Sequence, residues 1–584
     1  MKGIISTLAT VWRIASPYFR SEDRWMGRLL LAAVIIIELA IVGLTVLLNS
    51  WNANFYNALQ EKNWDVFVYQ LGYFSVLAAA FILLAVYQLY LNQWLQIRWR
   101  RWLTETYLNR WLETSNHYRM QLLGDAADNP DQRIAEDVNQ FVSLTLTIGL
   151  QLLSAVVTLL SFMAILWALS AEAPFLLFGM TTSIPGYLLW AALIYAVIGT
   201  ALTHLIGRKL IALNFLQQRY EADFRFNLVR VRESGEQIAL LNGEAAERDR
   251  LLLRFGNVIT NWYAIMSRQK KLTFFTSGYN QAAVVFPFIM GAPAYFAGAV
   301  QLGGLMQIAN AFGQVQGALS IFVTLYTRLT DWRAVIARLD GFDQSVTMAQ
   351  TLAVTPPVVT VTPGDGAAIT LKDLAVRLPN GAPLVNAADL TIAAGDRVLV
   401  NGPSGSGKST LFRAMAGIWP FGAGTVTVPK GAKIMMLPQR PYFPIAPLAA
   451  AVAYPAEPGT YDSAKVAELI AAVGLPALAG RMEEEAHWNR MLSLGEQQRL
   501  GIARAILLAP DYLFLDEATA SLDEAAETTV YKLLEDRLPK TTLVSIGHRA
   551  TLAAFHKRRM NVAKDGERFW LRDSGAITDA KPNA

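Results

Sequence analysis

The chain contains no cysteine among its 584 residues. That absence excludes disulfide bonds, thiolate metal ligands and cysteine nucleophiles, although it does not assign the protein to a compartment. Charged residues are also scarce, at 17 % of the chain, whereas about a quarter is usual in soluble domains. Because 53 % of the residues are hydrophobic, we expect part of the chain to lie in a lipid bilayer.

Several long stretches contain no Asp, Glu, Lys or Arg, and one further apolar run contains only Glu38. A helix needs about 20 apolar residues to cross the core of a bilayer. The first run is too long for a signal peptide and is followed by no small-residue cleavage pattern, so we expect it to be retained. The pattern predicts six membrane helices, at about 29–48, 71–91, 141–169, 180–207, 272–297 and 305–327.

Positive charge is unevenly distributed around these helices. The loops on one side are rich in basic residues: Arg20, Arg24, Arg28, Arg98, Arg100, Arg101, Arg208, Lys209, Arg268, Lys270 and Lys271. The loops on the other side hold few charges. Because basic loops stay in the cytoplasm, we expect both termini there. The same bias accounts for the net charge of +5 without nucleic acid as a partner.

Composition divides the rest of the chain. We expect residues 1–341 to form the transmembrane domain. From 342 to 368 the chain becomes rich in Thr, Val, Pro and Gly, which predicts a linker. From 369 to 584, strands, glycine turns and helices alternate as in an α/β nucleotide-binding domain.

A complete phosphate-binding loop follows the apolar strand at 397–400. Its residues are Gly402, Pro403, Ser404, Gly405, Ser406, Gly407, Lys408 and Ser409, with Thr410 next in the helix that follows. Glycines let backbone N–H groups curl around phosphates, and the helix N-terminus favours negative charge. We expect Lys408 to neutralise the β- and γ-phosphates and Ser409 to bind Mg²⁺. ATP and Mg²⁺ are therefore the expected cofactors.

A second apolar strand, at 511–515, ends in two adjacent acids. This is the Walker B pattern of ATPases. We expect Asp516 to hold Mg²⁺, directly or through water. Glu517 is the expected general base, which polarises the attacking water.

Further motifs connect the two strands to a family. Residues 492–499, Leu-Ser-Leu-Gly-Glu-Gln-Gln-Arg, resemble the ABC signature, Gln439 the Q-loop, residues 520–523 the D-loop and His548 the switch histidine. The chain thus resembles an ABC half-transporter, with a six-helix exporter-type transmembrane domain and an α/β P-loop nucleotide-binding domain. The resemblance implies catalytic roles for Gln439 and His548, with Gln439 also near the metal.

The same resemblance implies a homodimer with two identical ATP sites. Each ATP would lie between one subunit's P-loop and the Ser493, Gly495 and Glu496 of the other. Two positions depart from the family pattern: Leu494 replaces a small residue, and Leu378 stands where an aromatic often stacks on adenine. The exporter architecture also implies short transverse helices that contact the ATPase, expected near 119–137 and 233–247.

The membrane half carries a second resemblance. Residues 51–70, 129–137, 184–187 and 233–247 look like the SbmA/BacA peptide-uptake proteins, over about 20–340, and more loosely like the peroxisomal acyl-CoA half-transporters. SbmA/BacA proteins lack an ATPase and use a proton gradient, so this chain resembles a fused, BacA-like ABC subgroup. The resemblance implies uptake of peptides, antimicrobial ones included, or of other hydrophilic solutes across a bacterial inner membrane.

Polar residues within the spans suggest a transport path. Gln307, Asn310 and Gln314 share one face of the sixth helix, and Glu38 lies midway along the first. Polar groups at such depth are costly unless they face water or are paired, so hydrogen bonding between helices remains the alternative. Export of lipid or drug, or a membrane ATPase through which no solute passes, are the alternative functions.

Overall fold

The computed structural model describes residues 2–122, 124, 129–172, 175–177, 180–182, 184–566 and 568–577. The chain divides into two compact units. The first comprises residues 1–108 and 129–342, and the second comprises 109–128 and 343–584. The short segment 109–128, which lies between two membrane helices in the sequence, therefore belongs to the unit that contains the nucleotide motifs.

Six long helices contain the expected spans. They are α2 (Arg24–Gln60), α3 (Trp64–Leu112), α6 (Val138–Glu172), α7 (Tyr187–Glu233), α9 (Glu244–Phe296) and α10 (Leu302–Leu352). The expected fourth span begins too early, because residues 180–182 form strand β2, which pairs with β1 (Phe175–Leu177). Four described helical segments are long and apolar enough to cross a membrane: 24–60, 64–122, 130–172 and 187–233. The prolines and amides of α9 and the amides of α10 make those helices less apolar.

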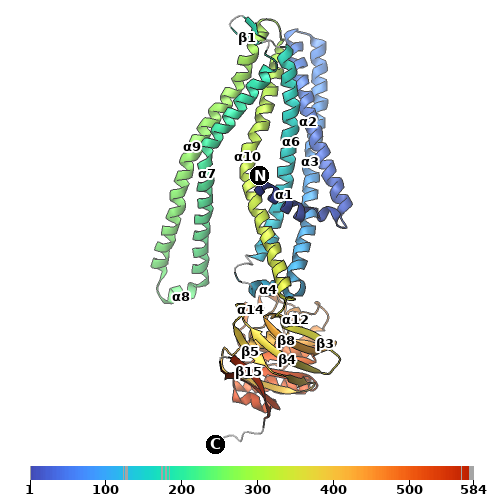
Figure 1. Cartoon of the computed structure of the whole chain (residues 1–584), viewed down its shortest axis with the longest axis vertical. Coiled ribbons are helices and arrows are strands. Elements are labelled where there is room, and N and C mark those ends of the chain that lie inside the picture. The colour runs from blue at the N-terminus through green and yellow to red at the C-terminus, as the bar shows by residue number, and fades with distance from the viewer. Residues whose placement is uncertain are drawn as a thin grey trace. The chain divides into compact units, whose positions relative to one another are not determined.

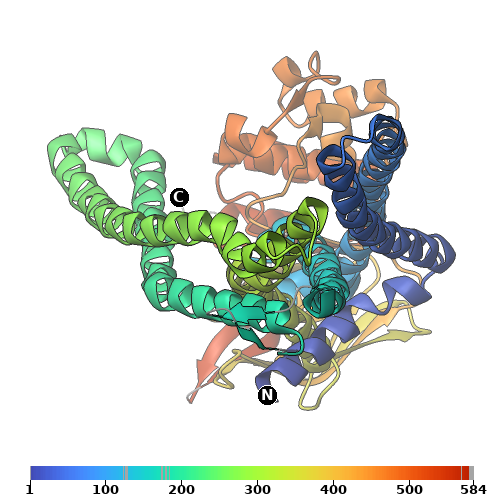
Figure 2. The same ribbon diagram turned by 90° about the horizontal axis from the view of Figure 1, so that it is seen from above.

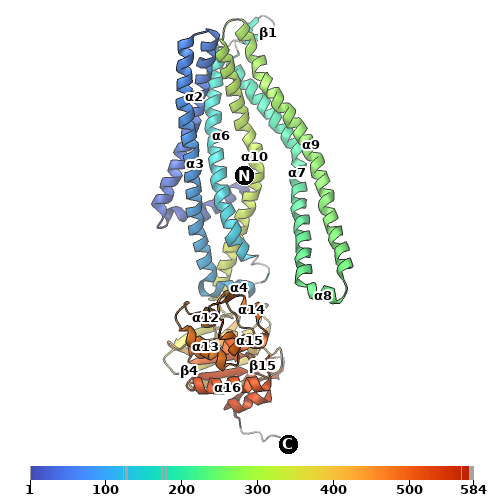
Figure 3. The same cartoon turned by 180° about the vertical axis from the view of Figure 1, so that it is seen from behind.

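The helices extend well beyond a bilayer. Helices α7 and α9 have 47 and 53 residues, so each is more than twice as long as the roughly 30 Å of a bilayer core. They run side by side as a hairpin closed by α8 (Gly235–Leu240) (Figures 1 and 3). Tyr195 and Tyr279 join them: their rings stack 4.6 Å apart, and each hydroxyl donates to the other's carbonyl oxygen.

The N-terminal helix α1 (Lys2–Ala15) crosses the bundle rather than running along it (Figure 2). It leads into a short 3₁₀ turn, η1 (Tyr18–Arg20). Tyr18 is fully buried and stacks on Trp99 of α3, while Asp23 forms an ion pair with Arg98. These contacts anchor the entry to α2 against the C-terminal half of α3.

Short helices lie at or near both ranges in which transverse helices were expected: α4 (Asn116–Leu122) and α8. Helix α4 belongs to the second unit, where Leu122 packs against the core of the sheet. It begins before residue 119, and residues 123 and 125–128 lie outside the described part of the chain. From residue 130 onward the expected range belongs to the first unit, because α5 (Pro130–Gln132) and the π-helical turn η3 (Arg133–Asp137) lead directly into α6.

The second unit is built on a large mixed sheet. Its strands are β3 (Thr360–Gly364), β4 (Ala368–Arg377), β5 (Pro383–Ala387), β6 (Leu390–Ala393), β7 (Arg397–Asn401), β8 (Gly422–Pro429), β9 (Ile434–Leu437), β12 (Tyr512–Asp516), β13 (Thr542–Ile546), β14 (Arg558–Asp565) and β15 (Arg568–Ala576). The order is β3-β8-β4-β5-β15-β14-β7-β13-β12-β9, with β6 paired to β4. Neighbours β7, β13, β12 and β9 are parallel, so their carboxyl ends share one edge. Within 342–368, expected as a linker, α10 continues to Leu352 and β3 joins the sheet.

Helices and short strands complete this unit. They are α11 (Lys408–Met415), β10 (Ala446–Pro447), α12 (Leu448–Ala453), α13 (Ser463–Ala472), η4 (Pro476–Leu478), β11 (Glu485–Ala486), α14 (Trp488–Met491), α15 (Leu494–Leu508), α16 (Glu524–Arg537) and η5 (Ala550–Phe555). Trp488, fully buried, lies in the core that α12, α13, α15 and α16 share with β9, β12 and β13. This core supports the sheet edge at which the nucleotide motifs lie.

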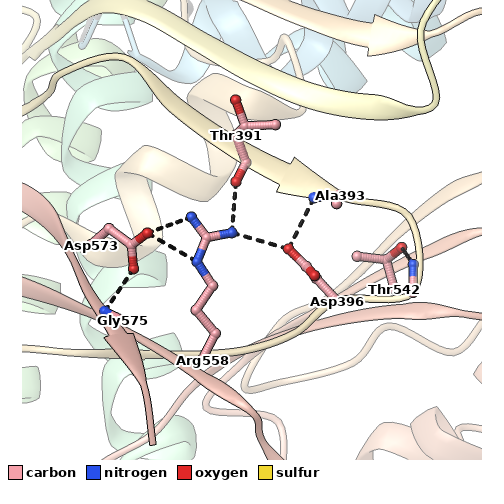
Figure 4. A network of polar contacts seen from close by, with 8 residues as sticks. Thr391, Ala393, Asp396, Thr542, Arg558, Asp573 and Gly575 are labelled. Carbon is pink, nitrogen blue, oxygen red and sulfur yellow. Dashed lines mark hydrogen bonds and ion pairs between the residues drawn. The ribbon is translucent and has the colours of Figure 1, made fainter.

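Arg558 of β14 ties the far side of the sheet together (Figure 4). Its guanidinium donates to the carboxylates of Asp573 and Asp396 and to the carbonyl oxygen of Thr391. The hydrogen bonds that Arg558 donates to Asp573 raise the pKa of Arg558 and lower the pKa of Asp573. The network joins β14 to β15, to β6 and to the turn before β7.

Candidate functional site

Four loops that carry the nucleotide motifs meet at one edge of the sheet. The P-loop follows β7, the switch segment follows β13, the Walker B acids end β12, and the Q-loop follows β9. These strands are parallel neighbours, and the carboxyl ends of parallel strands form the ligand-binding edge of α/β sheets. Motifs that are up to about 150 residues apart in sequence are thereby brought into one site.

The P-loop has the backbone that a phosphate cradle requires. Gly405 and Gly407 have φ angles of +77° and +89°, which residues with side chains rarely adopt. Lys408 opens α11 and is 6 % exposed; its Nζ donates to the carbonyl oxygens of Gly402 (2.9 Å) and Pro403 (2.8 Å). Burial lowers the pKa of Lys408, against the charges of Glu517 and Asp516, which raise it. The ammonium thus lies inside the loop, where a phosphate would accept hydrogen bonds from it.

The donor set suits a nucleotide with Mg²⁺. Ser406 Oγ is buried without a hydrogen-bond partner among the described residues, as expected of a group that awaits an anion. Ser409 Oγ donates to Asp516 Oδ1 at 2.7 Å, and hydroxyl and carboxylate oxygens are ligands that Mg²⁺ prefers. Burial raises the pKa of Asp516, while the bond from Ser409 lowers it. Thr410 follows in the first turn of α11, and Ser404 is exposed at the tip of the loop.

Glu517 and His548 lie next to each other. Glu517 has a φ of +51°, a strained conformation for a residue with a side chain, and its N–H donates to Ile546 at the end of β13. His548 Nε2 lies 3.5 Å from Glu517 Oε1. The strained backbone aims the expected base at the switch histidine and away from the strand.

The signature residues begin α15. Ser493 is the N-cap: its Oγ and N–H both bond the Glu496 carboxylate, at 2.7 and 2.9 Å, and these bonds lower the pKa of Glu496. Gly495 lies against the D-loop, since a Cβ there would be 3.2 Å from the carbonyl oxygen of Ser521. Among the described residues, no hydrogen bond joins 493–496 to 402–410. Ser493 is exposed at this end of α15, whereas the Glu496 carboxylate is engaged in its own capping box.

Two other positions are less engaged in the site. The Gln439 side chain is exposed, and its backbone carbonyl accepts a hydrogen bond from Gln498. Leu378 is half-buried against the sheet core. Two hydrogen bonds close its turn: the Leu378 N–H donates to the Ala382 carbonyl oxygen, and the Gly381 N–H donates to the Leu378 carbonyl oxygen. An aliphatic side chain therefore occupies the expected adenine-stacking position.

The membrane residues have mixed environments. Gln88 of α3 donates to Glu38 Oε2 at 2.8 Å, so Glu38 makes the interhelical hydrogen bond that was one alternative. Gln307, Asn310 and Gln314 are partly exposed and make no hydrogen bond to a described residue. Asn49 of α2, which the sequence analysis missed, is fully buried with both amide atoms unpaired in the described structure. Its spacing from Glu38 is the signal that could have found it, because eleven residues return to the same helix face.

A P-loop ATPase joined in one chain to long membrane helices defines the ABC half-transporter class. The family described as "ABC transporter transmembrane region 2" matches residues 14–296, and the family described as "ABC transporter" matches residues 385–520. The chain belongs to the ABC transporter family. It is therefore a membrane protein that binds ATP and couples its hydrolysis to transport.

Particular relatives extend over nearly the whole chain. An uncharacterized ABC transporter ATP-binding protein of Haemophilus influenzae is 35 % identical, over 95 % of this chain and 92 % of its own. The inner membrane ABC transporter ATP-binding protein YddA of Escherichia coli is 32 % identical, covering 92 % and 94 %. The mouse lysosomal cobalamin transporter ABCD4 is 25 % identical, covering 95 % and 94 %.

A solved structure has the same fold. A bacterial Atm1-family ABC exporter with ATP bound superposes with a TM-score of 0.68 at 18 % identity, over 93 % of this chain and 94 % of the other. The likeness establishes the exporter-type transmembrane domain fused to a nucleotide-binding domain.

Proposed function

We propose that this protein is a homodimeric importer that uses ATP to move hydrophilic solutes, peptides above all, across a bacterial inner membrane. The observation that carries the hydrophilic substrate class is the row of polar groups within the spans. Gln307, Asn310 and Gln314 are partly exposed on one face of α10 and bond no described residue. Amides in a bilayer need partners, and a wet path supplies them. The resemblance to SbmA/BacA proteins supports the direction and the peptide.

The residues of the nucleotide site would perform the ATPase steps as follows. Lys408 would exchange its two loop carbonyls for phosphate oxygens, and the P-loop N–H groups would bind the remaining charge. Ser409 and Asp516, with Gln439 moving inward, would hold Mg²⁺, which when bound neutralises charge that develops on the phosphates. Glu517 would accept a proton from the attacking water, and His548 would hold the transferred phosphate group and orient Glu517.

Two copies would complete each site. Ser493 and Gly495 at the exposed N-terminus of α15 would contact the ATP bound by the partner's P-loop, because a helix N-terminus favours phosphate. Glu496 would act by fixing that N-terminus through its capping box. The basic loops support a cytoplasmic position for both termini and the ATPase. YddA, named as an inner membrane protein, supports the location.

Export is the second candidate, favoured by the likeness to the Atm1-family exporter. Glu38 is partly exposed as well as bonded to Gln88, so its charge would attract cationic peptides. A role for a proton gradient would appear as dependence of uptake on that gradient in the presence of ATP.

Uptake of a labelled cationic peptide into proteoliposomes, with ATP on the side of the nucleotide domain, tests the proposal. Glu517→Gln should keep ATP binding but lower hydrolysis by about two to four orders of magnitude and abolish uptake. Glu38→Gln keeps the acceptor for Gln88 but removes the charge, so uptake should fall while basal ATPase and assembly persist.

Each result that contradicts the proposed peptide import points to one alternative. Peptide that moves only toward the opposite side makes the protein an exporter, and ATP hydrolysis without movement of any solute makes it a membrane ATPase of another kind. Wild-type uptake in Glu38→Gln would leave Glu38 with the structural role alone. Gln88→Leu is the matched control, because it removes the hydrogen bond and retains the charge.

A further inference from the structure

A buried glutamine in the signature helix is bonded at both ends of its amide. Gln498 of α15 is 1 % exposed. Its Nε2 donates to the backbone carbonyl of Gln439 at 2.9 Å, and its Oε1 accepts from the N–H of Ser521 at 2.9 Å. Gln439 belongs to the Q-loop and Ser521 to the D-loop. One side chain thus links the backbones of two loops that are 82 residues apart.

Helix α15 supports both loops around this link. On the Q-loop side, a Cβ on Gly501 would lie 3.3 Å from Pro441, and Arg504 donates to the carbonyl oxygen of Tyr442 at 2.8 Å. On the D-loop side, Gly495 lies against Ser521. The Q-loop therefore lies along one stretch of α15 and the D-loop against its N-terminus, with Gln498 between them.

We infer that Gln498 is a positioning residue that couples the two ATP sites of the dimer. The inference rests on the proposed homodimer, in which the Q-loop serves the ATP on its own subunit and the D-loop and Ser493 face the ATP on the partner. A shift of the Q-loop when one site fills pulls the Gln439 carbonyl. The planar amide of Gln498 passes that shift to Ser521, because Gln498 is buried and leaving either end of its amide unpaired is costly.

The neighbouring glutamine provides a matched comparison. Gln497 is 7 % exposed and equally well bonded: its Nε2 donates to the carbonyl oxygens of Asn489 and Leu492, and its Oε1 accepts from Asn489 Nδ2. None of these bonds reaches the D-loop. Loss of Gln497 should therefore loosen α15 without cutting the link between the two loops.

The test uses the purified full-length transporter with Gln498→Met and Gln497→Met, which have similar side-chain lengths. ATPase rates are measured against ATP concentration. We expect a sigmoidal curve for the wild type, and for Gln498→Met a Hill coefficient of about 1. Its kcat should fall by about ten-fold with the KM for ATP within about three-fold. Gln497→Met should keep the wild-type Hill coefficient.

A second variant covers a folding failure of the first. Gln498→Leu is uncharged and removes both hydrogen bonds, so it too should lose cooperativity. The inference is overturned by a cooperative Gln498 variant, by equal loss in Gln497→Met, or by a wild type without cooperativity. Complementation between Lys408→Ala and Ser493→Arg subunits tests the dimer separately. If complementation succeeds while the Gln498 variants keep their cooperativity, the coupling role of Gln498 is contradicted and the proposed dimer is not.

Discussion

At the scale of single residues, the clearest buried titratable group is His556. It is 4 % exposed, its Nδ1 lies 2.7 Å from the Leu552 carbonyl oxygen, and its Nε2 lies 2.9 Å from Ser545 Oγ. A carbonyl oxygen can only accept, so Nδ1 carries the proton and Nε2 accepts from Ser545. The imidazole is therefore neutral, and burial lowers its pKa to about 4.

This pKa makes the second unit sensitive to acid. An unfolded histidine titrates near 6.5, so between pH 6.5 and 4 the unfolded chain binds more protons than the folded protein does. The free energy of unfolding therefore decreases as the pH is lowered. From pH 7 to pH 5 the loss should be about 2 kcal/mol. His556→Asn, which keeps a donor for Leu552 but does not titrate, should flatten that dependence.

Hydrogen exchange at β13 and α16 in the purified protein measures this free energy, once the intrinsic exchange rate at each pH is divided out. His487, which is partly exposed and belongs to no strand or helix, is the control. His487→Asn should leave the pH dependence at β13 as in the wild type. An unchanged slope in His556→Asn would show that the imidazole is not the group that titrates.

At the scale of elements, a buried charge cluster joins the base of α6 to α10. Asp137, in the π-helical turn η3, accepts from Arg133 Nη1 at 2.5 Å and from Arg338 Nε and Nη2 at 2.9 and 2.6 Å. Arg133 and Asp137 are 5 % and 1 % exposed. The extra residue of a π turn rotates side chains relative to a regular helix, which lets one carboxylate face both arginines.

Breaking this cluster should weaken the first unit. Asp137→Asn removes the carboxylate charge that faces the buried Arg133 guanidinium, and breaking a buried ion pair in this way typically costs about 3 kcal/mol. Arg338 contributes less, because 37 % of its side chain is exposed. The midpoint of thermal inactivation in detergent reports the loss. Glu136→Gln is the control, since this exposed neighbour accepts only from Gln132, and an equal loss there would remove the cluster as the cause.

At the scale of the whole molecule, the two-copy site makes the sharpest prediction. Lys408→Ala disables a P-loop, and Ser493→Arg disables the surface that it meets on the partner. Homodimers of either variant should be inactive, whereas a mixed dimer has one site with both halves intact. Co-expressed, differently tagged subunits purified through both tags should regain up to about half of the wild-type ATPase, in line with one working site of two.

The control pair carries both substitutions in the same subunit, paired with a wild-type subunit. That dimer has one defective half in each of its two sites, so it should be as inactive as the homodimers, unlike the mixed dimer. Mixed dimers as inactive as their parents would contradict the shared site. A Lys408→Ala or Ser493→Arg homodimer with full activity would contradict the assignment of that residue.

The sequence by itself determined the class of the protein. Apolar runs report membrane helices because a bilayer accepts no unpaired backbone, and the nucleotide loops are short contiguous motifs whose chemistry is local. It did not determine where the helices begin and end. Strand β2 starts where the fourth span was expected. Helix α10 continues to Leu352, because polar helical extensions carry no hydropathy signal.

Only the tertiary structure decided which distant residues meet. It assigned residues 109–128 to the nucleotide unit, paired Glu38 with Gln88, and placed the Gln498 amide between Gln439 and Ser521. The physical reason is that a hydrogen bond depends on distances of about 3 Å, which strand order and helix packing set. A glutamine in a helix has the same sequence signal whether its amide faces solvent or joins two loops.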